Sequence, residues 1–174
     1  VRGFYSRIDG SAQPYILNLP VGFAVSDARR YRLDVFLHGR DDGGFELNFF
    51  NKSTTTFTGM PFNPGPDRFI LQPYGRYSNA SRFAGETDVL EAIASVQQAY
   101  AIDENRVVIG GFSMGGASAW HLALHHADRW AAFAVRPVCA TRRTSTPSTK
   151  STLMIASSAI IRAVATGMGP KPRI

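Results

Sequence analysis

The chain has 174 residues, of which 44% are hydrophobic and 18% are charged, and its formal net charge is +6. This length suits one domain with a large buried core. The longest apolar stretch, residues 153–166, is too short to cross a membrane and contains Arg162, which excludes a membrane-spanning helix. Residues 136–174 hold seven of the 19 Lys and Arg residues and no Asp or Glu, so the positive charge belongs to one segment rather than to a patterned surface. We therefore predict a soluble chain with no nucleic-acid partner and no membrane partner.

Little in the sequence decides the cellular compartment. No charged segment, apolar block and cleavage site follow Val1, so no signal peptide is predicted, although a chain that does not begin with Met is compatible with earlier trimming. The single cysteine, Cys139, excludes a disulfide within the chain and does not separate reducing from oxidising compartments. The localisation is therefore left unassigned.

Short strands are predicted in the first part of the chain. Residues 13–20 and 31–39 have the alternation of half-buried strands, and the second run ends at a Gly-containing break. Residues 41–67 are rich in turn-forming residues and predict a long loop. Residues 68–75 are a further apolar strand that is closed by Pro and Gly.

Helices and strands are predicted to alternate after this point. Apolar residues with helical spacing predict a helix over residues 87–100, capped by Thr87 or Asp88. The pattern then predicts a turn at 103–106, a buried strand at 106–111, a helix at 114–128 and a strand at 130–135. Strands that alternate with helices predict a three-layer α/β/α fold with a mostly parallel sheet.

The composition changes at about residue 136. Residues 139–152 are rich in Ser, Thr and Arg without apolar periodicity, which is typical of a loop or of disorder. Residues 153–166 could form a short amphipathic helix. We predict a core domain over residues 1–135 and a divergent basic tail over residues 136–174.

Ser113 lies in the sequence GGFSMGG, between the strand predicted at 106–111 and the helix predicted at 114–128. The pattern G-x-S-x-G is that of a nucleophile elbow, a sharp turn that places a serine at its tip and needs small residues two positions before and after it. The N-terminus of the following helix points its N–H groups at an oxyanion formed there, so Met114 is a candidate donor. As a bare pattern the motif also occurs by chance, but here the strand and helix that it requires are both predicted.

The sequence LHGR at residues 37–40 ends an earlier predicted strand. In hydrolases whose serine lies on a nucleophile elbow, a His-Gly at the end of such a strand begins the loop that supplies the second oxyanion donor. Here this donor would be the N–H of Gly39 or of Arg40. We interpret His38 as a residue that orders this loop rather than as the catalytic base.

Five separated stretches together resemble the α/β-hydrolase superfamily, and specifically its prolyl-oligopeptidase-like and esterase serine hydrolases. They are residues 9–20, 31–40, 69–76, 83–93 and 100–132, and the resemblance covers roughly residues 4–135. It implies that Ser113 is the nucleophile, that Met114 is an oxyanion donor and that His38-Gly39 belongs to the oxyanion loop. It also implies that the fold is an incomplete α/β-hydrolase fold.

The other two members of a catalytic triad are missing from their usual positions. In this superfamily the acid and then the histidine follow the nucleophile, but the only carboxylate after Ser113 is Asp128, and the only histidines are His121, His125 and His126. A helix rises about 1.5 Å per residue, which puts His121 about 12 Å along the axis from Ser113. A general base must approach within about 3.2 Å of the serine oxygen, so none of the three histidines is within reach.

The HxxxHH pattern at residues 121–126 has the spacing at which two histidines share one helix face, as in some metal sites. No third ligand lies nearby in the sequence, and the glutamate of HExxH motifs is lacking. We therefore interpret these histidines as an exposed or interface face, and we predict neither a metal nor a cofactor.

Two functions remain open at this stage. One is a serine hydrolase that cleaves small-molecule esters or peptides by acyl transfer through Ser113, with activity impaired by the missing acid and histidine. The other is a catalytically inactive, truncated hydrolase fragment or a binding remnant. Because the superfamily sheet continues past the elbow with strands that are not recognisable in this sequence, we also expect self-association through an unpaired apolar edge.

Overall fold

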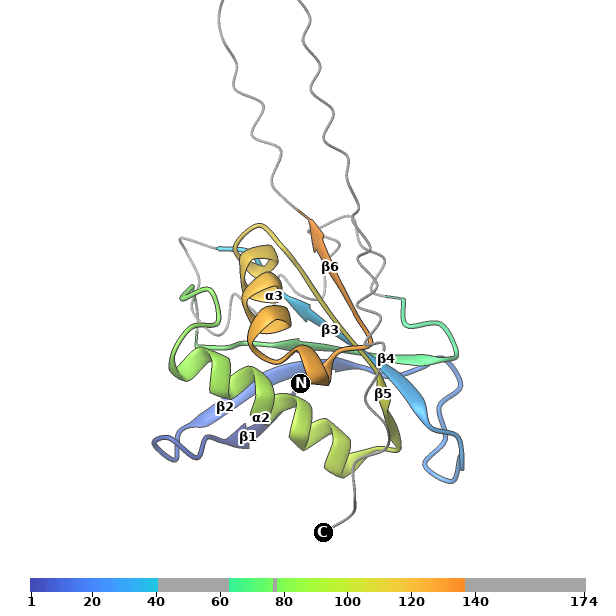
Figure 1. Ribbon diagram of the computed structural model, residues 1–174. Coiled ribbons are helices and arrows are strands. Elements are labelled where there is room, and N and C mark those ends of the chain that lie inside the picture. The colour runs from blue at the N-terminus through green and yellow to red at the C-terminus, as the bar shows by residue number, and fades with distance from the viewer. Residues whose placement is uncertain (41–62, 77, 137–174) are drawn as a thin grey trace, which may run out of the picture.

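The computed structural model in Figure 1 describes residues 1–40, 63–76 and 78–136. Within these residues the chain forms one six-stranded sheet with the strand order β1-β2-β4-β3-β5-β6. The elements are β1 (Arg2–Tyr5), β2 (Ala12–Asn18), β3 (Tyr31–Leu37), β4 (Arg68–Pro73), α2 (Ala84–Ala99), β5 (Ile102–Phe112), α3 (Met114–His125), the 3-10 helix η1 (Ala127–Arg129) and β6 (Ala132–Arg136).

The sheet is mixed, and its parallel part includes β5, the strand that precedes Ser113. β4, β3, β5 and β6 run parallel to one another, whereas β1 and β2 add an antiparallel edge next to β4. Each parallel pair of neighbouring strands needs a crossover, and α2 and α3 lie in two such crossovers. The predicted α/β class with a mostly parallel sheet is therefore confirmed.

Both described helices cover the same face of the sheet (Figure 1). Alternate residues of β3 point to this face, and the intervening Arg32 and Asp34 point to the opposite one. The helices contribute their own buried stripes to the same hydrophobic core, whose members include Leu33, Val35, Leu71, Val89, Val96, Ile109, Ala119 and Leu122. Fully burying one such aliphatic side chain contributes about 1.5–3 kcal/mol. Among the described residues, these helices and the sheet are two of the three expected layers.

The first helix begins earlier than its periodicity predicts. α2 begins at Ala84 rather than at residue 87, and Phe83 caps it without a side-chain hydrogen bond. The predicted caps, Thr87 and Asp88, are inside the helix. Asp88 is 1% exposed, accepts hydrogen bonds from Arg76 and Ser6 and therefore serves a buried polar network rather than a helix end.

The turn predicted at residues 103–106 is part of β5 instead. In the pairing of β3 with β5, Tyr31 is opposite Ile102 and Leu33 is opposite Val107, so several residues of β5 face a single step of β3. A strand with such a bulge can contain residues that are common in turns, because the extra residues do not pair with the neighbouring strand. The second helix ends at His125 rather than at residue 128, and η1 follows it.

Several predictions concern residues outside the described part of the chain. These are most of the loop at 41–67, the loop at 139–152, the helix at 153–166 and the tail domain at 136–174, apart from Arg136. None of the helices in the described part has the length and apolarity that a membrane span requires.

Candidate active site

Ser113 lies directly between the last residue of β5 and the first residue of α3. Its backbone has φ 56° and ψ −117°, a conformation that non-glycine residues rarely adopt. Strain of this kind costs about 1–3 kcal/mol and persists only where the surrounding structure enforces it. The hydroxyl does not cap the helix, and it makes no hydrogen bond within the described residues. The strained backbone therefore presents a serine side chain that is not used for local structure.

Close backbone contacts require the two glycines that stand two residues before and two residues after Ser113. A Cβ on Gly115 would overlap the main-chain oxygen of Leu37 and lie 2.6 Å from the oxygen of His38. A Cβ on Gly111 would overlap the carbonyl group of Gly115 and lie 2.9 Å from the oxygen of Leu37. The elbow thus crosses the end of β3 at a distance that only glycine permits.

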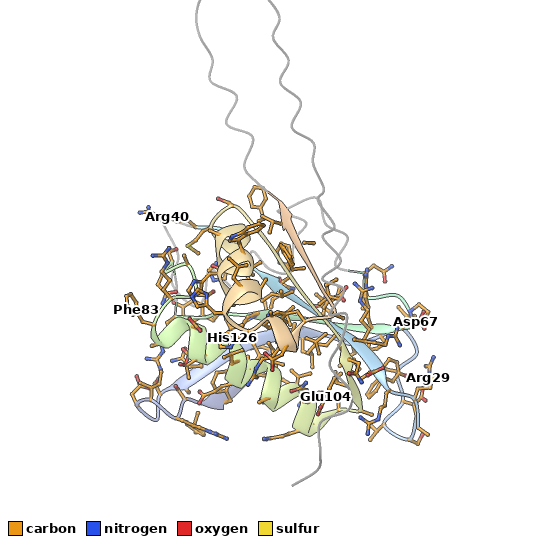
Figure 2. All side chains as sticks on the ribbon, viewed as in Figure 1. Arg29, Arg40, Asp67, Phe83, Glu104 and His126 are labelled. Atoms are coloured by element: carbon orange, nitrogen blue, oxygen red, sulfur yellow. The ribbon has the colours of Figure 1, made fainter. Side chains whose placement is uncertain are left out.

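The end of β3 and the loop after it lie beside the serine. Leu37 pairs with Gly111 in the parallel ladder, so β3 and β5 end at the same edge of the sheet, as the sequence predicts. A Cβ on Gly39 would lie 3.5 Å from Cβ of Ser113 and 3.3 Å from the ring of Phe112. Gly39 and Ser113 are therefore direct neighbours. Arg40 is exposed and lies at the end of the molecule where α3 begins (Figure 2).

The start of α3 supplies N–H groups next to Ser113. The carbonyl oxygen of Ser113 accepts hydrogen bonds from the N–H groups of Gly116 and Ala117, at 3.0 and 3.2 Å. Met114 is the first helical residue, and an N–H at that position has no acceptor within its own helix. The positive end of the helix dipole favours a negatively charged oxygen at this place.

His38 is held by main-chain groups at the edge of the sheet. Its Nδ1 lies 2.8 Å from the oxygen of Gly39, and its Nε2 lies 2.9 Å from the oxygen of Tyr74. Its ring also stacks on the ring of Tyr74, with 6.5 Å between the centroids. These contacts join the loop after β3 to the end of β4, which supports the interpretation of His38 as a residue that orders the loop.

Two of the three histidines near the C-terminal end of α3 contact α2, and the third contacts the main chain of α3 itself. Glu86 of α2 accepts hydrogen bonds from Nε2 of His121 at 2.8 Å and from Nε2 of His126 at 2.6 Å. Nδ1 of His125 donates to the oxygen of His121 at 2.8 Å. Partial burial raises the pKa of Glu86, but the hydrogen bonds from the two histidines outweigh it, so the net pKa of Glu86 is lowered.

Sequence reasoning did not identify Glu86 as the partner of these histidines. The available signal was the position of Glu86 in the first turn of the preceding helix, but pairing it with residue 121 or 126 requires knowing that α2 and α3 are adjacent. Asp128 lies in η1, past the end of α3 that is remote from Ser113. Within residues 1–40, 63–76 and 78–136, no group of three His, Cys, Asp or Glu side chains has an arrangement that could hold a metal ion.

A strand that ends in a glycine-flanked, strained serine at the start of a helix, on a mostly parallel sheet, defines an α/β protein of the hydrolase type. Residues 68–159 match the model of the phospholipase/carboxylesterase family. The chain belongs to this family, and by family it is a hydrolase. The match extends beyond residue 135, where the sequence predicts a domain boundary, and that boundary stays a prediction.

Solved structures of esterases and serine hydrolases have the same fold. A thermostable esterase is 26% identical with a TM-score of 0.56, and the alignment covers 76% of this chain and 39% of the esterase. FphF, a fluorophosphonate-binding serine hydrolase of Staphylococcus aureus, is 20% identical with a TM-score of 0.53, over 75% of this chain and 52% of FphF. A ferulic acid esterase of Anaeromyces mucronatus is 16% identical with a TM-score of 0.55, over 76% of this chain and 55% of the esterase.

This chain therefore spans between about two fifths and just over half of the length of these proteins. The esterase and serine hydrolase part of the expected relationship is confirmed. The prolyl-oligopeptidase-like part stays a prediction, because a dipeptidyl aminopeptidase from Bacteroides ovatus that matches at 15% identity shows the fold alone.

Proposed function

We propose that this chain carries the nucleophile half of a serine esterase site, with Ser113 as the nucleophile. The observation that carries the proposal is the backbone of Ser113, at φ 56° and ψ −117°, between two glycines that the end of β3 does not allow to be larger. Strain enforced in this way around an unused hydroxyl is typical of a functional residue.

The oxyanion donors in this proposal are the N–H of Met114 and the N–H of Gly39 or of Arg40. Ser113 Oγ would attack the carbonyl carbon of an ester, and the carbonyl oxygen would become an oxyanion between these donors. Collapse of this intermediate expels the alcohol and leaves an acyl-serine, which water then hydrolyses. The contact between Gly39 and Ser113 supports this assignment, because it brings the two donor segments together.

A general base must take the proton of Ser113, and the contacts of the four histidines support none of them in this role. All four histidines are at described positions: 38, 121, 125 and 126. The contacts of His38 with two carbonyl oxygens, and those of the others with Glu86 and with the end of α3, support roles in structure. We therefore propose that this chain by itself is impaired and hydrolyses esters slowly.

The proposed substrate class is a small-molecule carboxylic ester, in agreement with the family and with the esterases among the similar structures. A peptide substrate has less support, since it rests on the distant dipeptidyl aminopeptidase.

A second candidate is a catalytically inactive hydrolase fragment or binding remnant. It is favoured by the contacts that occupy the histidines.

Rescue by an external base separates the two candidates. The full chain is mixed with p-nitrophenyl acetate, with and without added imidazole, and the rate for Ser113→Ala under the same conditions is subtracted. We expect a slow, Ser113-dependent rate that imidazole increases at least about tenfold, because imidazole would supply the base while the proposed oxyanion donors stabilise the intermediate.

Labelling by a fluorophosphonate provides an independent measurement. We expect slow labelling that is lost in Ser113→Ala and kept in Ser26→Ala, a matched change of an exposed serine. Equal rates for wild type and Ser113→Ala, with and without imidazole, would show an inactive remnant. Fast stoichiometric labelling without imidazole would show that a base is present and would contradict the proposed impairment.

A further inference from the structure

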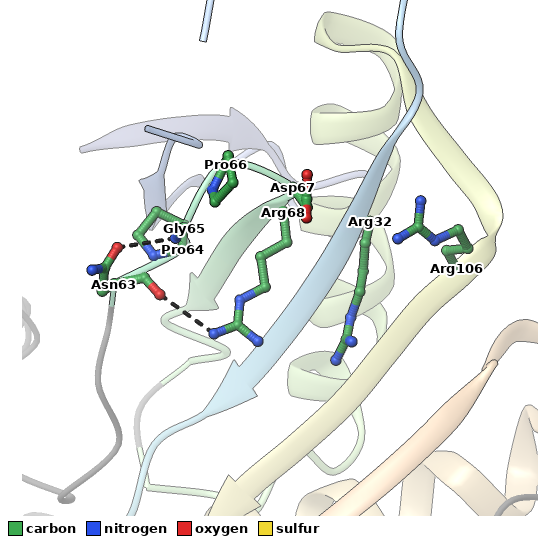
Figure 3. Close-up of a pocket in the computed structure, with 8 residues that line it drawn as sticks. All are labelled: Arg32, Asn63, Pro64, Gly65, Pro66, Asp67, Arg68 and Arg106. Atoms are coloured by element: carbon green, nitrogen blue, oxygen red, sulfur yellow. Dashed lines mark hydrogen bonds between the residues drawn. The ribbon is translucent and has the colours of Figure 1, made fainter. Parts of the chain in front are cut away.

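A concavity of about 500 Å³ lies at the opposite end of the sheet from Ser113. Its lining residues are Arg32, Asn63, Pro64, Gly65, Pro66, Asp67, Arg68 and Arg106 (Figure 3). Arg32 and Arg68 stand at the beginnings of β3 and β4, whereas Ser113 follows the end of β5. Strands rise about 3.3 Å per residue, so the length of β3 between Arg32 and Leu37 separates the two places by about 16 Å. This concavity is therefore separate from the candidate active site.

Three arginines from three neighbouring strands line the concavity. Arg32 and Arg68 are directly opposite each other in the β3–β4 ladder, and Arg106 comes from the bulge of β5 on the other side of β3. Figure 3 shows the three side chains next to one another across these strands. Like charges at directly opposite positions destabilise a sheet unless something compensates for them.

One carboxylate compensates for two of the three arginines. Asp34 accepts hydrogen bonds from Arg32 and from Arg68, the latter at 3.0 Å, and its side chain is 19% exposed. Arg106 forms no hydrogen bond and no ion pair in the part of the chain that the structure describes. Asp67 also lines the concavity, but no ion pair joins it to any of the three arginines there. The lining thus keeps an excess of positive charge and one guanidinium whose donors are unused.

The opposite wall of the concavity is held in a fixed shape. The N–H of Gly65 donates to Oδ1 of Asn63 at 3.0 Å, and the oxygen of Gly65 accepts from the N–H of Val21 at 2.7 Å. Arg68 also donates to the oxygen of Asn63 at 3.3 Å. Pro64 and Pro66 have fixed φ angles and no N–H groups, so this wall is rigid and offers mainly carbon surface.

We propose that this concavity binds the phosphate group of a small soluble phosphomonoester. Guanidinium groups match the geometry of phosphate oxygens and bind them through pairs of hydrogen bonds. A phosphate monoester offers three terminal oxygens to donors from three strands, whereas a carboxylate offers two. Arg106 supplies the unpaired donors, Arg32 and Arg68 flank the anion, and Pro64 and Pro66 contact the carbon part of the ligand.

Calorimetric titration of the full chain tests this proposal. Inorganic phosphate and phenyl phosphate are the probes, at an ionic strength held constant with sodium chloride. Both are expected to bind saturably, with phenyl phosphate several-fold tighter because its ring contacts the proline wall. Arg106→Gln is expected to weaken binding at least about tenfold, which is the effect of losing a charge-assisted hydrogen bond. Arg106→Lys keeps the positive charge but lacks the paired N–H donors of the guanidinium group. Its affinity is expected to lie between those of the wild type and of Arg106→Gln.

Arg129→Gln is the matched control, because Arg129 is an exposed arginine in η1, away from the concavity. Its binding is expected to equal that of the wild type. Arg106 is exposed, so its replacement leaves the fold intact, which a thermal melt verifies. Equal weakening by Arg106→Gln and Arg129→Gln would overturn the proposal. It would also be overturned by co-sedimentation with phosphatidate vesicles in the absence of saturable binding of phenyl phosphate.

Discussion

The starts of α2 and α3 have nearly the same backbone and very different surroundings. Phe83 caps α2 with φ 53° and ψ −124°, and Ser113 caps α3 with φ 56° and ψ −117°. In both turns the cap oxygen accepts the N–H groups three and four residues later, and a glycine, Gly85 or Gly115, stands two residues after the cap.

The difference lies in what each turn contacts. Ser113 follows β5 directly and crosses the main chain of Leu37 and His38, which brings it next to Gly39. Residues 74–82 separate Phe83 from the end of β4, and Phe83 is 90% exposed. A strained cap by itself therefore does not define a chemical site. The contact of the cap with the end of a neighbouring strand distinguishes the turn at Ser113 from the turn at Phe83.

The largest effect is expected from adding a methyl group to the glycines of the two turns. In Gly115→Ala the new Cβ would overlap the main chain of Leu37, which cannot move without breaking the sheet, so we expect a loss of at least about 3 kcal/mol in the free energy of unfolding. In Gly85→Ala the nearest atoms belong to the side chain of Asn79, at 2.6 and 2.7 Å, although the oxygen of Gly75 is also at 2.7 Å. We expect a smaller loss of about 1–3 kcal/mol.

Urea unfolding of both variants measures the difference. Gly10→Ala is the control, because Gly10 has φ 69° and no atom lies within 4 Å of the place that its added methyl group would take, so only the cost of the backbone conformation remains. That cost is about 1–2 kcal/mol. A Gly115→Ala variant no less stable than Gly10→Ala would mean that the elbow does not cross β3 as closely as described.

A smaller effect, of opposite sign, is expected from relieving the strain at the caps. Phe83→Gly and Ser113→Gly replace residues at positive φ with the one residue that tolerates it, and each is expected to stabilise the chain by about 1 kcal/mol. Ser113→Gly is also expected to abolish fluorophosphonate labelling, whereas Phe83→Gly should leave it unchanged. Loss of labelling in Phe83→Gly would show that the two turns act together.

The smallest effect concerns Glu86, which joins the two helices through His121 and His126. Its lowered pKa means that the folded state favours the carboxylate, so its contribution is present above the ordinary value of 4.5 and is lost as the pH falls through the lower folded value. We expect Glu86→Gln to be less stable than the wild type at pH 7, by less than about 1 kcal/mol because the pair is partly solvated, with a difference that shrinks below pH 4.5.

Thermal melts of both proteins from pH 7 to pH 3 measure this difference. Asp9 and Asp27 also have lowered pKa values, chiefly because of hydrogen bonds from Arg76 and from Tyr31, so only the difference between variant and wild type reports on Glu86. A difference that grows as the pH falls below 4.5 would contradict the assignment.

Local patterns were sufficient to predict the strand-to-helix turn at Ser113 and the strand end that lies beside it. The glycines around Ser113 and the His-Gly after β3 are short motifs of a few adjacent residues. Each is typical of the end of a strand, so the motif predicts both the strand and the place where it ends. The start of α2 was predicted wrongly because Asp is a residue type common at helix caps. The Asp88 side chain instead accepts hydrogen bonds in a buried network whose partners include the distant Ser6.

The arginine-lined concavity could not be predicted, because it depends on the strand order. Arg32 and Arg68 are opposite each other only because β4 lies next to β3, and Arg106 joins them through the bulge of β5. His121 and His126 posed the same difficulty, since their acceptor, Glu86, is on another helix. The roles of Ser113, Met114, Gly39 and Arg40, and the expected self-association, stay predictions.

The buried network around Asp88 also has a consequence for the order in which the chain folds. Arg76 is a near neighbour of Asp88 in sequence, but Ser6, which donates to the same carboxylate at 3.0 Å, is 82 residues away. Arg76 also binds Asp9, 67 residues away, in the turn between β1 and β2. Contacts over such separations form late, because a large loop must close first. During synthesis on a ribosome, the β1–β2 hairpin is therefore expected to dock only after α2 has been synthesised. In stopped-flow refolding, we expect β1 and β2 to dock in the slowest phase.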